Sequence, residues 1–429
     1  MVTENQYELQ DEPRVVVTGI GILSPLGKSL GEIWQALENN VSGLRPITRF
    51  DTGTLKSRVA GEISESNQVD TRFKPEYYDQ LKRPQRYSVS AALSAVQSAG
   101  LVITPENSGQ VACVITSNTP FTESESQLPD ESNIHSAHSV AALMGVSGPV
   151  IPLSSDHLSG IEAIVEATEL IKRKRAFVAI AGATDARIDR RNFEINESMG
   201  LLSTKHNDNP ESASRPLEND RDGFIMAEGS VVFVLEALEV AVTRGAKILA
   251  EIEGSALTFS PGKEGSPDTD PIYIGRAIQG ALIASGRIQS EVDAVMLDAN
   301  GSVLDDAHEA KAIHRVFGSA ARHHMYTPAL KSHFGDLGAA SGPLSMAITL
   351  EAMNKQMIPS TRNLETEDED IDLDANPNGI RSDALRVVMI NSIHRSQNAT
   401  IAICDPTAMR QIPENFNIPD EATIPELDI

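Results

Sequence analysis

Serine, aspartate and histidine side chains are concentrated at one predicted elbow of the chain. Residues 150–160 read VIPLSSDHLSG, in which a short apolar run gives way to polar residues and then to a helical pattern that starts at Ser159. Ser159 and Glu162 have the spacing of a capping box. A side chain at a strand-to-helix elbow lies near free backbone N–H groups and the positive end of the helix dipole, so the position suits a nucleophile or an anion. His157 occupies it.

The chemistry available to His157 has several interpretations. The imidazole can be a packed, hydrogen-bonded side chain without a chemical role, which is the interpretation that we favour. The neighbouring serines and Asp156 suggest a hydrolase, but residues adjacent in sequence rarely face one another as a triad does, and no G-x-S-x-G motif surrounds them. A metal site of His157, Asp336 and His333 is conceivable, although facing imidazole and carboxylate groups more often only hydrogen-bond. We expect neither a metal nor another cofactor.

The composition of the chain excludes several classes of protein. Its 429 residues are 40% hydrophobic and 22% charged, as is usual for a globular protein. The net charge of −24 argues against binding to nucleic acid or to anionic membranes. Cys113 and Cys404 lie in apolar, strand-like runs and are expected to be core residues, not a disulfide. There is no amino-terminal signal pattern and no apolar run of about 20 residues, so we expect a cytoplasmic location.

Alternating strand and helix patterns divide the chain into two similar halves. The predicted organisation is a frayed N-terminus (1–13), an N-terminal half (14–246), a C-terminal half (247–406) and an acidic, proline-containing tail (407–429). The segment 331–342, KSHFGDLGAASG, precedes a predicted helix over 343–354 and repeats the plan of the elbow unit 154–172. Duplicated halves that face each other are therefore expected.

The repeated pattern consists of buried strands and the helices between them. Strands are predicted over 110–117, 176–183, 230–236, 247–254, 294–299 and 384–393, helices over 30–37, 87–99, 274–285 and 309–317, and a polar surface loop over 119–133. Gly19 and Gly21 follow a further apolar run. Position 24 is a serine, so the third glycine of a dinucleotide-binding loop is missing and we predict a close-packed turn.

Several separate motifs together indicate a known family. They are VTGIG near the start, SRPLENDRDGF from Ser214, the Lys331 segment quoted above, and IPSTRNL from Ile358. In this order and spacing the chain resembles, over residues 14–406, a β-ketoacyl-[acyl-carrier-protein] synthase of the elongating type. The resemblance implies a thiolase-like α/β fold, with duplicated halves in a five-layered αβαβα arrangement that dimerises.

The resemblance also implies that the catalytic positions of the family have changed. Active members use an elbow cysteine to attack a thioester, and two histidines to promote decarboxylation and stabilise the enolate. Gly148, Pro149 and Gly160 keep the spacing of the family's elbow motif, which places His157 at the cysteine position. Asn300 lies in the loop of the first histidine and Asp336 at the position of the second. An imidazole cannot form the stable acyl thioester that condensation needs. Because both histidine positions have changed as well, no catalytic position is intact.

The family's oxyanion loop, normally Asn-Ser-Phe-Gly-Phe-Gly-Gly, has also changed. Here it reads NSIHRSQ from Asn391, with Ile393, His394, Arg395 and Ser396 in place of its central residues and Arg395 at the gate. Glycine permits backbone conformations that these side chains resist, so a different path is expected. Lys331 and Glu309 are retained, could still pair, and are interpreted as architectural.

We therefore expect a catalytically silent homologue that resembles the chain-length factors of type II polyketide systems. Such a subunit would form a heterodimer with an active β-ketoacyl synthase and shape the acyl pocket. The alternatives are a residual decarboxylase or acyltransferase with a rebuilt pocket, and a self-paired acyl-binding protein. The strand over 176–183 is expected at the dimer interface, where its unpaired apolar edge requires a partner.

Acyl carrier protein is the second expected partner. Lys82, Arg83, Arg86 and Lys205 lie near the positions of the family's carrier-protein patch. The net charge of −24 opposes binding of an acidic carrier protein, so we expect contact mainly through the partner subunit.

Overall fold

The computed structural model describes residues 12–64, 70–117, 135–261, 270–377 and 379–410. The strands are β1 (Val15–Leu23), β2 (Arg45–Pro46), β3 (Val59–Ala60), β4 (Val111–Ser117), β5 (Val150–Leu153), β6 (Val178–Asp185), β7 (Gly229–Ala237), β8 (Ala250–Phe259), β9 (Ala294–Met296), β10 (Met357–Ile358), β11 (Arg381–Ser382), β12 (Val387–His394) and β13 (Gln397–Cys404). The predicted polar loop 119–133 lies outside the described residues, as do most of 1–13 and of 407–429.

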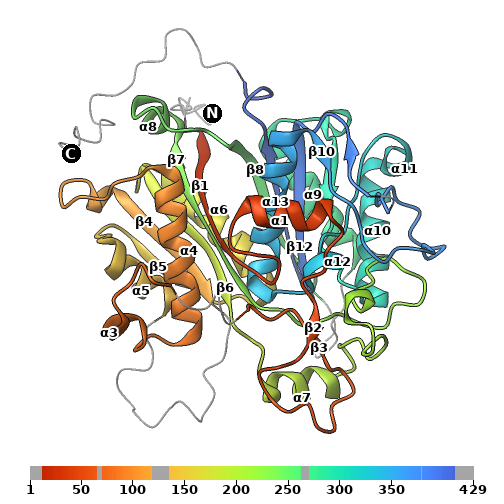
Figure 1. Cartoon of the computed structure of the whole chain (residues 1–429). Helices are drawn as coiled ribbons and strands as arrows, with labels where there is room; N and C mark the ends of the chain where they lie inside the picture. The colour runs from red at the N-terminus through yellow and green to blue at the C-terminus, as the bar shows by residue number, and fades with distance from the viewer. Residues whose placement is uncertain (1–11, 65–69, 118–134, 262–269, 378, 411–429) are drawn as a thin grey trace.

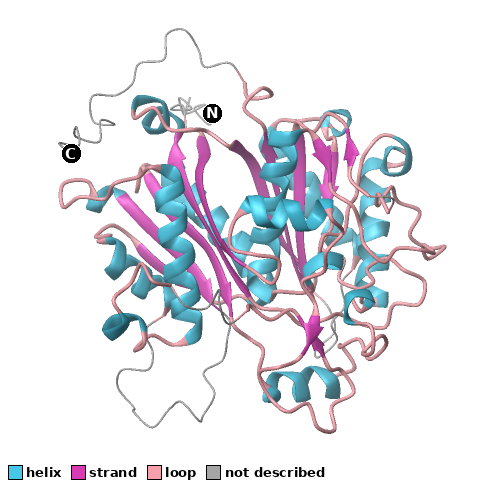
Figure 2. Ribbon diagram, in the orientation of Figure 1, coloured by secondary structure: helices cyan, strands magenta, loops and turns pink. Residues whose placement is uncertain are grey.

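Helices cover both faces of the main sheet (Figures 1 and 2). They are α1 (Leu30–Glu38), α3 (Pro75–Tyr78), α4 (Arg83–Ala99), α5 (Ser136–Met144), α6 (Ser159–Lys172), α7 (Arg190–Ser198), α8 (Leu238–Thr243), α9 (Pro271–Ser285), α10 (Val303–Phe317), α11 (Ala320–His323), α12 (Lys331–Phe334) and α13 (Ser341–Lys355). The predicted elements are present, with ends that differ by a few residues. The structure places β8 over Ala250–Phe259, for example, whereas the sequence suggested 247–254.

The elements form five layers. Helices α4 and α5 pack on the N-terminal strands, and α9 and α10 cover the outer face of the C-terminal strands. Between the two sets of strands lie α6 and α13, which also contact each other. The sequence of layers is therefore αβαβα, in agreement with the expectation of duplicated halves.

The strand β6 lies inside the sheet, and the expectation that it forms an exposed edge is wrong. The strand order is β5-β4-β6-β7-β1-β8-β13-β12-β9. β6 pairs with β7 in antiparallel orientation along its whole length and with β4 in parallel from Val178 to Thr184, and all its residues are buried. Among the described residues the edge on this side is β5, which is half-buried at every position and pairs with β4.

Gly19 and Gly21 lie within the strand β1, so the expected turn is wrong, although the close packing is confirmed. A Cβ atom on Gly21 would lie 1.8 Å from the carbonyl oxygen of Ala91, in helix α4. The C-terminal half repeats this feature, because a Cβ on Gly254 would lie 2.4 Å from the backbone nitrogen of Ser285, at the end of α9. In each half, glycine lets a helix approach a central strand more closely than any side chain would permit.

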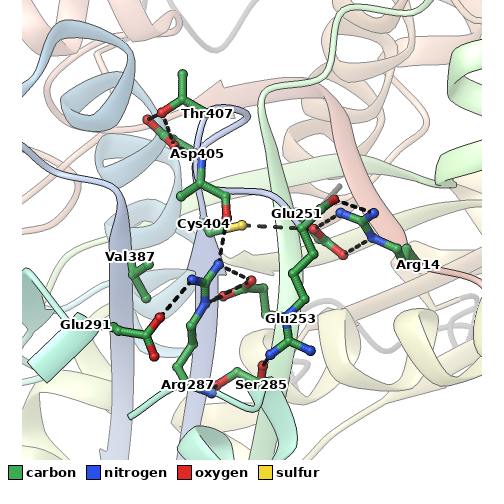
Figure 3. Close-up of polar contacts among 12 residues, drawn as sticks. Arg14, Glu251, Glu253, Ser285, Arg287, Glu291, Val387, Cys404, Asp405 and Thr407 are labelled. Atoms are coloured by element: carbon green, nitrogen blue, oxygen red, sulfur yellow. Dashed lines mark hydrogen bonds and ion pairs between the residues drawn. The ribbon is translucent and has the colours of Figure 1, made fainter. Parts of the chain in front are cut away.

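A cluster of ion pairs joins the two halves at one end of the sheet (Figure 3). The Arg14 guanidinium, just before β1, donates to both carboxylate oxygens of Glu251 at 2.7 and 2.6 Å. Arg287 contacts Glu253 at 2.6 Å from the other side of β8. Cys404 lies beside Glu251 as a free, buried thiol, and Cys113 is also free and buried, as expected.

No helix in the described part of the chain is long and apolar enough to span a membrane.

Candidate functional site

The elbow has the predicted strand-to-helix form. A short 3-10 turn, Asp156–Leu158, connects β5 to α6. Ser159 does not cap α6, contrary to the prediction, because Leu158 is the N-cap and the Ser159 hydroxyl donates to the Asp156 carbonyl at 2.7 Å. Asp156 has a positive φ of 59°, a conformation that is uncommon for residues other than glycine and occurs often at functional sites.

The elbows of the two halves face each other, as the duplication predicted. Gly160 opens α6 opposite the segment that precedes α13, and a Cβ at this position would lie 2.0 Å from the Ala339 carbonyl oxygen. Gly342 is similarly close to Ile161. Both glycines therefore allow the N-termini of the two central helices to meet beside His157.

Three polar side chains surround the His157 ring. Its Nδ1 lies 2.8 Å from Asp156 Oδ1, while its Nε2 lies 2.6 Å from Arg187 Nη1 and 3.4 Å from Asp336 Oδ1. Burial and the Arg187 guanidinium act to lower the pKa of His157, but the Asp336 and Asp156 carboxylates outweigh them and raise it. Because both ring nitrogens have polar partners, the imidazole is held in one orientation.

Asp336 is the centre of a buried network of charges. Lys331 Nζ lies 3.1 Å from Asp336 Oδ2 and 2.9 Å from Asp298 Oδ1. Burial favours the neutral form of Asp336, but Lys331, together with His157 and Arg187, lowers its pKa well below the usual range. The backbone N–H of Gly338 also donates to Asp336, at 2.8 Å. This carboxylate is therefore ionised and accepts hydrogen bonds only.

Asn300 joins this network, so the structure brings together the three positions that the resemblance singled out. Its Nδ2 donates to Asp336 Oδ2 at 3.3 Å, and its side-chain oxygen accepts from the Ser302 backbone at 2.9 Å. The amide is thus engaged on both sides.

Glu309 lies beneath the network and does not pair with Lys331, contrary to what their retention suggested. Its Oε1 accepts from the Asp298 backbone at 3.0 Å and from Asn391 Nδ2 at 2.8 Å. Burial, with the nearby Asp298 charge, raises the pKa of Glu309 to about 8. Burial likewise raises the pKa of Asp298 to about 6, although Lys331 opposes the shift. Glu309 is therefore largely protonated at neutral pH.

The segment at the family's oxyanion loop is a tight hairpin. Strand β12 continues through Ile393 to His394, which pairs with Gln397 at the start of β13, so Arg395 and Ser396 form the turn. Arg395 is exposed and has a positive φ of 52°. Within the loop that the resemblance connects with the oxyanion hole, the Ile393 backbone N–H donates to Asp298 Oδ2 at 3.1 Å. His394 stacks on His157 and lies 3.4 Å from Asp156 Oδ2.

A cavity of about 480 Å³ opens beside these side chains. Its wall includes His157, His394, Arg395 and Ser396 from the elbow and the hairpin, Asn300 from the loop before α10, and the residues Met199, Gly200, Leu201, Asp222, Gly223, Phe224, Ser302, Val303, Leu304 and Asp305. The wall thus combines polar groups from the elbow and the hairpin with apolar side chains, of which Phe224 lies edge-on to the His157 ring.

Other predicted site residues lie elsewhere or face inward. His333 is fully buried, with Nε2 2.8 Å from the Ser360 carbonyl, so it does not join His157 and Asp336 in a metal site. In the carrier-protein patch, Arg83 donates to the Ala186 and Ile188 carbonyls. Arg86 donates to the Leu81 carbonyl at 2.8 Å. Both are half-buried, and Lys205 is the exposed member of the patch.

Comparison with known proteins identifies the family. The model for the N-terminal domain of beta-ketoacyl synthase matches residues 12–241, and that for the C-terminal domain matches 249–365. The chain belongs to the beta-ketoacyl synthase family. The thiolase-like fold expected from the sequence is confirmed.

Relatives of this ketosynthase-family chain come from two kinds of biosynthesis. It is 31% identical to 3-oxoacyl-[acyl-carrier-protein] synthase 2 of Synechocystis sp., over 91% of this chain and 98% of the relative. It is also 31% identical to the tetracenomycin polyketide synthase ketoacyl synthase alpha subunit of Streptomyces glaucescens, over 88% of this chain and 93% of that one. Among solved structures, the ishigamide ketosynthase/chain length factor matches with a TM-score of 0.80 and 28% identity, over 92% of this chain and 99% of that chain.

The sequence interpretation missed two important members of the site. Arg187 follows the strand predicted over 176–183, and Asp298 lies near the end of the strand predicted over 294–299. Neither belongs to a recognisable spacing motif, and only the fold brings them to His157 and Lys331. Asp298 carried one signal, because an acidic residue at the end of an otherwise apolar strand is a candidate for a buried ion pair.

Proposed function

We propose that this chain is a non-catalytic ketosynthase-like subunit of the chain-length-factor type, which pairs with an active β-ketoacyl synthase. The observation that carries the proposal is the environment of His157. At the position where the family has its nucleophilic cysteine, the imidazole contacts Asp156 through one nitrogen, and Arg187 and Asp336 through the other. An acyl group cannot be stored there as a thioester.

The charge of Asp336 also opposes the decarboxylation half of the reaction. An enolate needs hydrogen-bond donors at its developing negative charge. Asp336 is ionised and repels such a charge, and the Asn300 amide donates one of its N–H groups to Asp336. These contacts favour the silent subunit over the alternative of a residual decarboxylase or acyltransferase.

The cavity supports a role in shaping the acyl pocket. Apolar side chains, including Met199, Leu201, Phe224 and Leu304, line part of its wall. The Asn300 amide in the same wall donates to Asp336, which Lys331 also contacts. A pocket of this kind can accommodate part of an acyl chain without reacting with it.

The proposed interface is the edge strand β5. Within the described part of the chain β5 pairs with β4 alone, so a strand from a second subunit can pair with the backbone N–H and C=O groups on its other side. The net charge of −24 disfavours self-association and favours a less acidic partner. Carrier protein would then dock mainly on that partner, because Arg83 and Arg86 are turned into the fold. We place this assembly in the cytoplasm, as expected from the sequence.

Co-expression with a ketosynthase encoded beside this chain tests the proposal. We expect a stable one-to-one complex by native mass spectrometry, and loss of condensation when the partner's nucleophilic cysteine alone is changed to alanine. Intact mass after incubation with acyl carrier protein should show no acyl adduct on this chain. A homodimer that ignores every co-encoded ketosynthase, or a stable adduct on His157, would contradict the proposal and favour the self-paired or acyltransferase alternatives.

A further inference from the structure

Asp156, His157 and His394 bring three metal-ligand atoms to the base of the cavity. One nitrogen from each imidazole and one carboxylate oxygen lie within 4.8 Å of one another. His157 Nδ1 is 2.8 Å from Asp156 Oδ1, and His394 Nε2 is 3.4 Å from Asp156 Oδ2. Ligands at about 2.1 Å from a tetrahedral Zn²⁺ lie about 3.4 Å apart, which matches the His394–Asp156 separation and exceeds the hydrogen-bonded His157–Asp156 contact. We propose that the three residues bind a divalent transition metal such as Zn²⁺.

The ligand set determines the class of metal. Two imidazoles and one carboxylate suit Zn²⁺, Fe²⁺ or Co²⁺, whereas Mg²⁺ and Ca²⁺ prefer oxygen ligands alone. Sites with three protein ligands usually leave a coordination position open for water or a bound molecule. Here that position faces the cavity, because both His157 and His394 form part of its wall.

The ring nitrogen of His157 that points away from the proposed metal has the kind of partner that metal-binding histidines usually have. Histidines that bind metals usually donate their second ring N–H to a carboxylate, which fixes the ring. His157 presents Nδ1 to the ligand cluster and Nε2 to Asp336 Oδ1, at 3.4 Å. Asp336 is itself held by Lys331 and the Gly338 backbone, so this second carboxylate has a fixed position.

Two rearrangements must accompany binding. Arg187 Nη1 donates to His157 Nε2 at 2.6 Å, so without metal the ring carries its proton on Nδ1. Metal binding moves this proton to Nε2 and turns Arg187 toward Asp336, whose Oδ1 is already 3.6 Å away. The stacked rings, with centroids 3.8 Å apart, must also tilt so that both nitrogens point at one ion. The half-buried His394, at the end of a hairpin, has room for this movement.

A second cluster of possible metal ligands differs from the elbow cluster in the charges that surround it. Glu251, Glu253 and Cys404 are also within 4.8 Å of one another. Their carboxylates are already paired with the Arg14 and Arg287 guanidinium groups, which provide the positive charge that a metal would bring (Figure 3). The elbow cluster instead joins the Asp156 carboxylate to two imidazoles, which are themselves metal ligands, and it borders an open cavity.

The test is titration of the chelator-treated, full-length chain with Zn²⁺ by calorimetry, and with Co²⁺ by visible absorption. We expect one site that binds Zn²⁺ with micromolar or tighter affinity, and Co²⁺ d–d bands of a four- or five-coordinate site. His394→Ala should weaken binding by more than about 100-fold, since loss of a residue that merely orients a ligand already reduces affinity by roughly 10- to 100-fold. Asp156→Asn, at a side chain that is 49% exposed, serves if His394→Ala does not fold.

His138→Ala is the matched control, because His135 and His138 form an exposed histidine pair with ring centroids 5.9 Å apart. This variant should leave the affinity and the Co²⁺ spectrum unchanged. Absence of a micromolar site, or a site that survives both His394→Ala and Asp156→Asn, would overturn the proposal. Loss of binding in His138→Ala instead would assign the metal to the surface pair and would overturn it as well.

Discussion

The imidazole of His394 lies flat against that of His157, with ring centroids 3.8 Å apart and an interplanar angle of 20°. The two residues come from different halves of the chain, one from the elbow before α6 and the other from the end of β12. Both occupy positions where the sequence departs from the family motifs. The two substituted residues therefore contact each other. Because each ring fills the space beside the other, the substitutions leave a packed site.

Restoring the cysteine alone should not restore condensation. In His157→Cys the elbow regains a thiol, but Asp336 stays ionised between Lys331 and Arg187, and Asn300 still donates to it. The enolate would form beside a negative charge, without the two histidines that stabilise it in active members of the family. We expect condensation at the level of the unmodified chain when the isolated variant is assayed with acyl and malonyl carrier proteins by mass spectrometry. An active ketosynthase is the positive control, and formation of a β-ketoacyl product by His157→Cys would show that the other changes are not disabling.

Glu309→Gln should be more stable than the native chain, and the difference in the free energy of unfolding should grow as the pH rises. Burial raises the pKa of Glu309 from its ordinary value of 4.5 to about 8 in the folded chain. The unfolded state therefore loses its proton first, and stability declines between pH 4.5 and about 8. Glutamine is neutral throughout and keeps an acceptor for the Asp298 N–H. We expect the variant to gain on the order of 2–4 kcal/mol relative to the native chain between pH 5 and pH 8.

Chemical denaturation of both chains at several pH values measures this difference. The Glu369→Gln change is a suitable control, because it removes one carboxylate at an exposed position of the chain. Parallel pH profiles for the native chain and Glu309→Gln would show that Glu309 is ionised in the folded state.

The layers of the fold could be predicted from the sequence because hydrophobic periodicity and the repeated elbow are local signals. The order of the strands could not. An apolar run such as β6 has the same appearance at an edge as in the middle of a sheet, and only its pairing with β4 and β7 distinguishes the two. Pro152 was the available signal for β5, since proline within a strand indicates an edge.

The positions of His157, Asn300 and Asp336 could be predicted because family motifs surround them, whereas their contacts could not. Arg187 reaches His157 from the loop after β6, and Asp298 reaches Lys331 from the end of β9. Such contacts depend on tertiary geometry that no short spacing encodes. The contacts of the retained Lys331 and Glu309 could not be predicted either. The two side chains do not pair with each other, because Lys331 contacts Asp298 and Glu309 accepts from Asn391.

Gly160→Ala should separate the two elbows. The added Cβ would lie 2.0 Å from the Ala339 carbonyl oxygen, which belongs to the backbone and has little freedom to move. We expect a loss of about 2–4 kcal/mol in the free energy of unfolding. Gly31→Ala in α1 is the matched control, since a Cβ there meets nothing within 4 Å and alanine should stabilise the helix by roughly 0.5–1 kcal/mol. Equal effects in the two variants, measured by denaturant unfolding, would rule out this close contact.

The edge strand β5 should be the surface through which a second subunit binds. It contributes four half-buried residues, Val150–Leu153, and pairs on one side with β4, so its outer backbone groups can extend the sheet into a partner. Ile151→Lys places a charge in this short strand and should disfavour pairing, because a buried unpaired lysine in the interface costs several kcal/mol. Ile283→Lys is the control, since Ile283 is 81% exposed on α9, in the outer layer of the other half. We expect native mass spectrometry of the co-expressed chains to show the one-to-one complex for Ile283→Lys and separate subunits for Ile151→Lys. An intact complex in Ile151→Lys, with the variant still folded by circular dichroism, would place the interface elsewhere on the molecule.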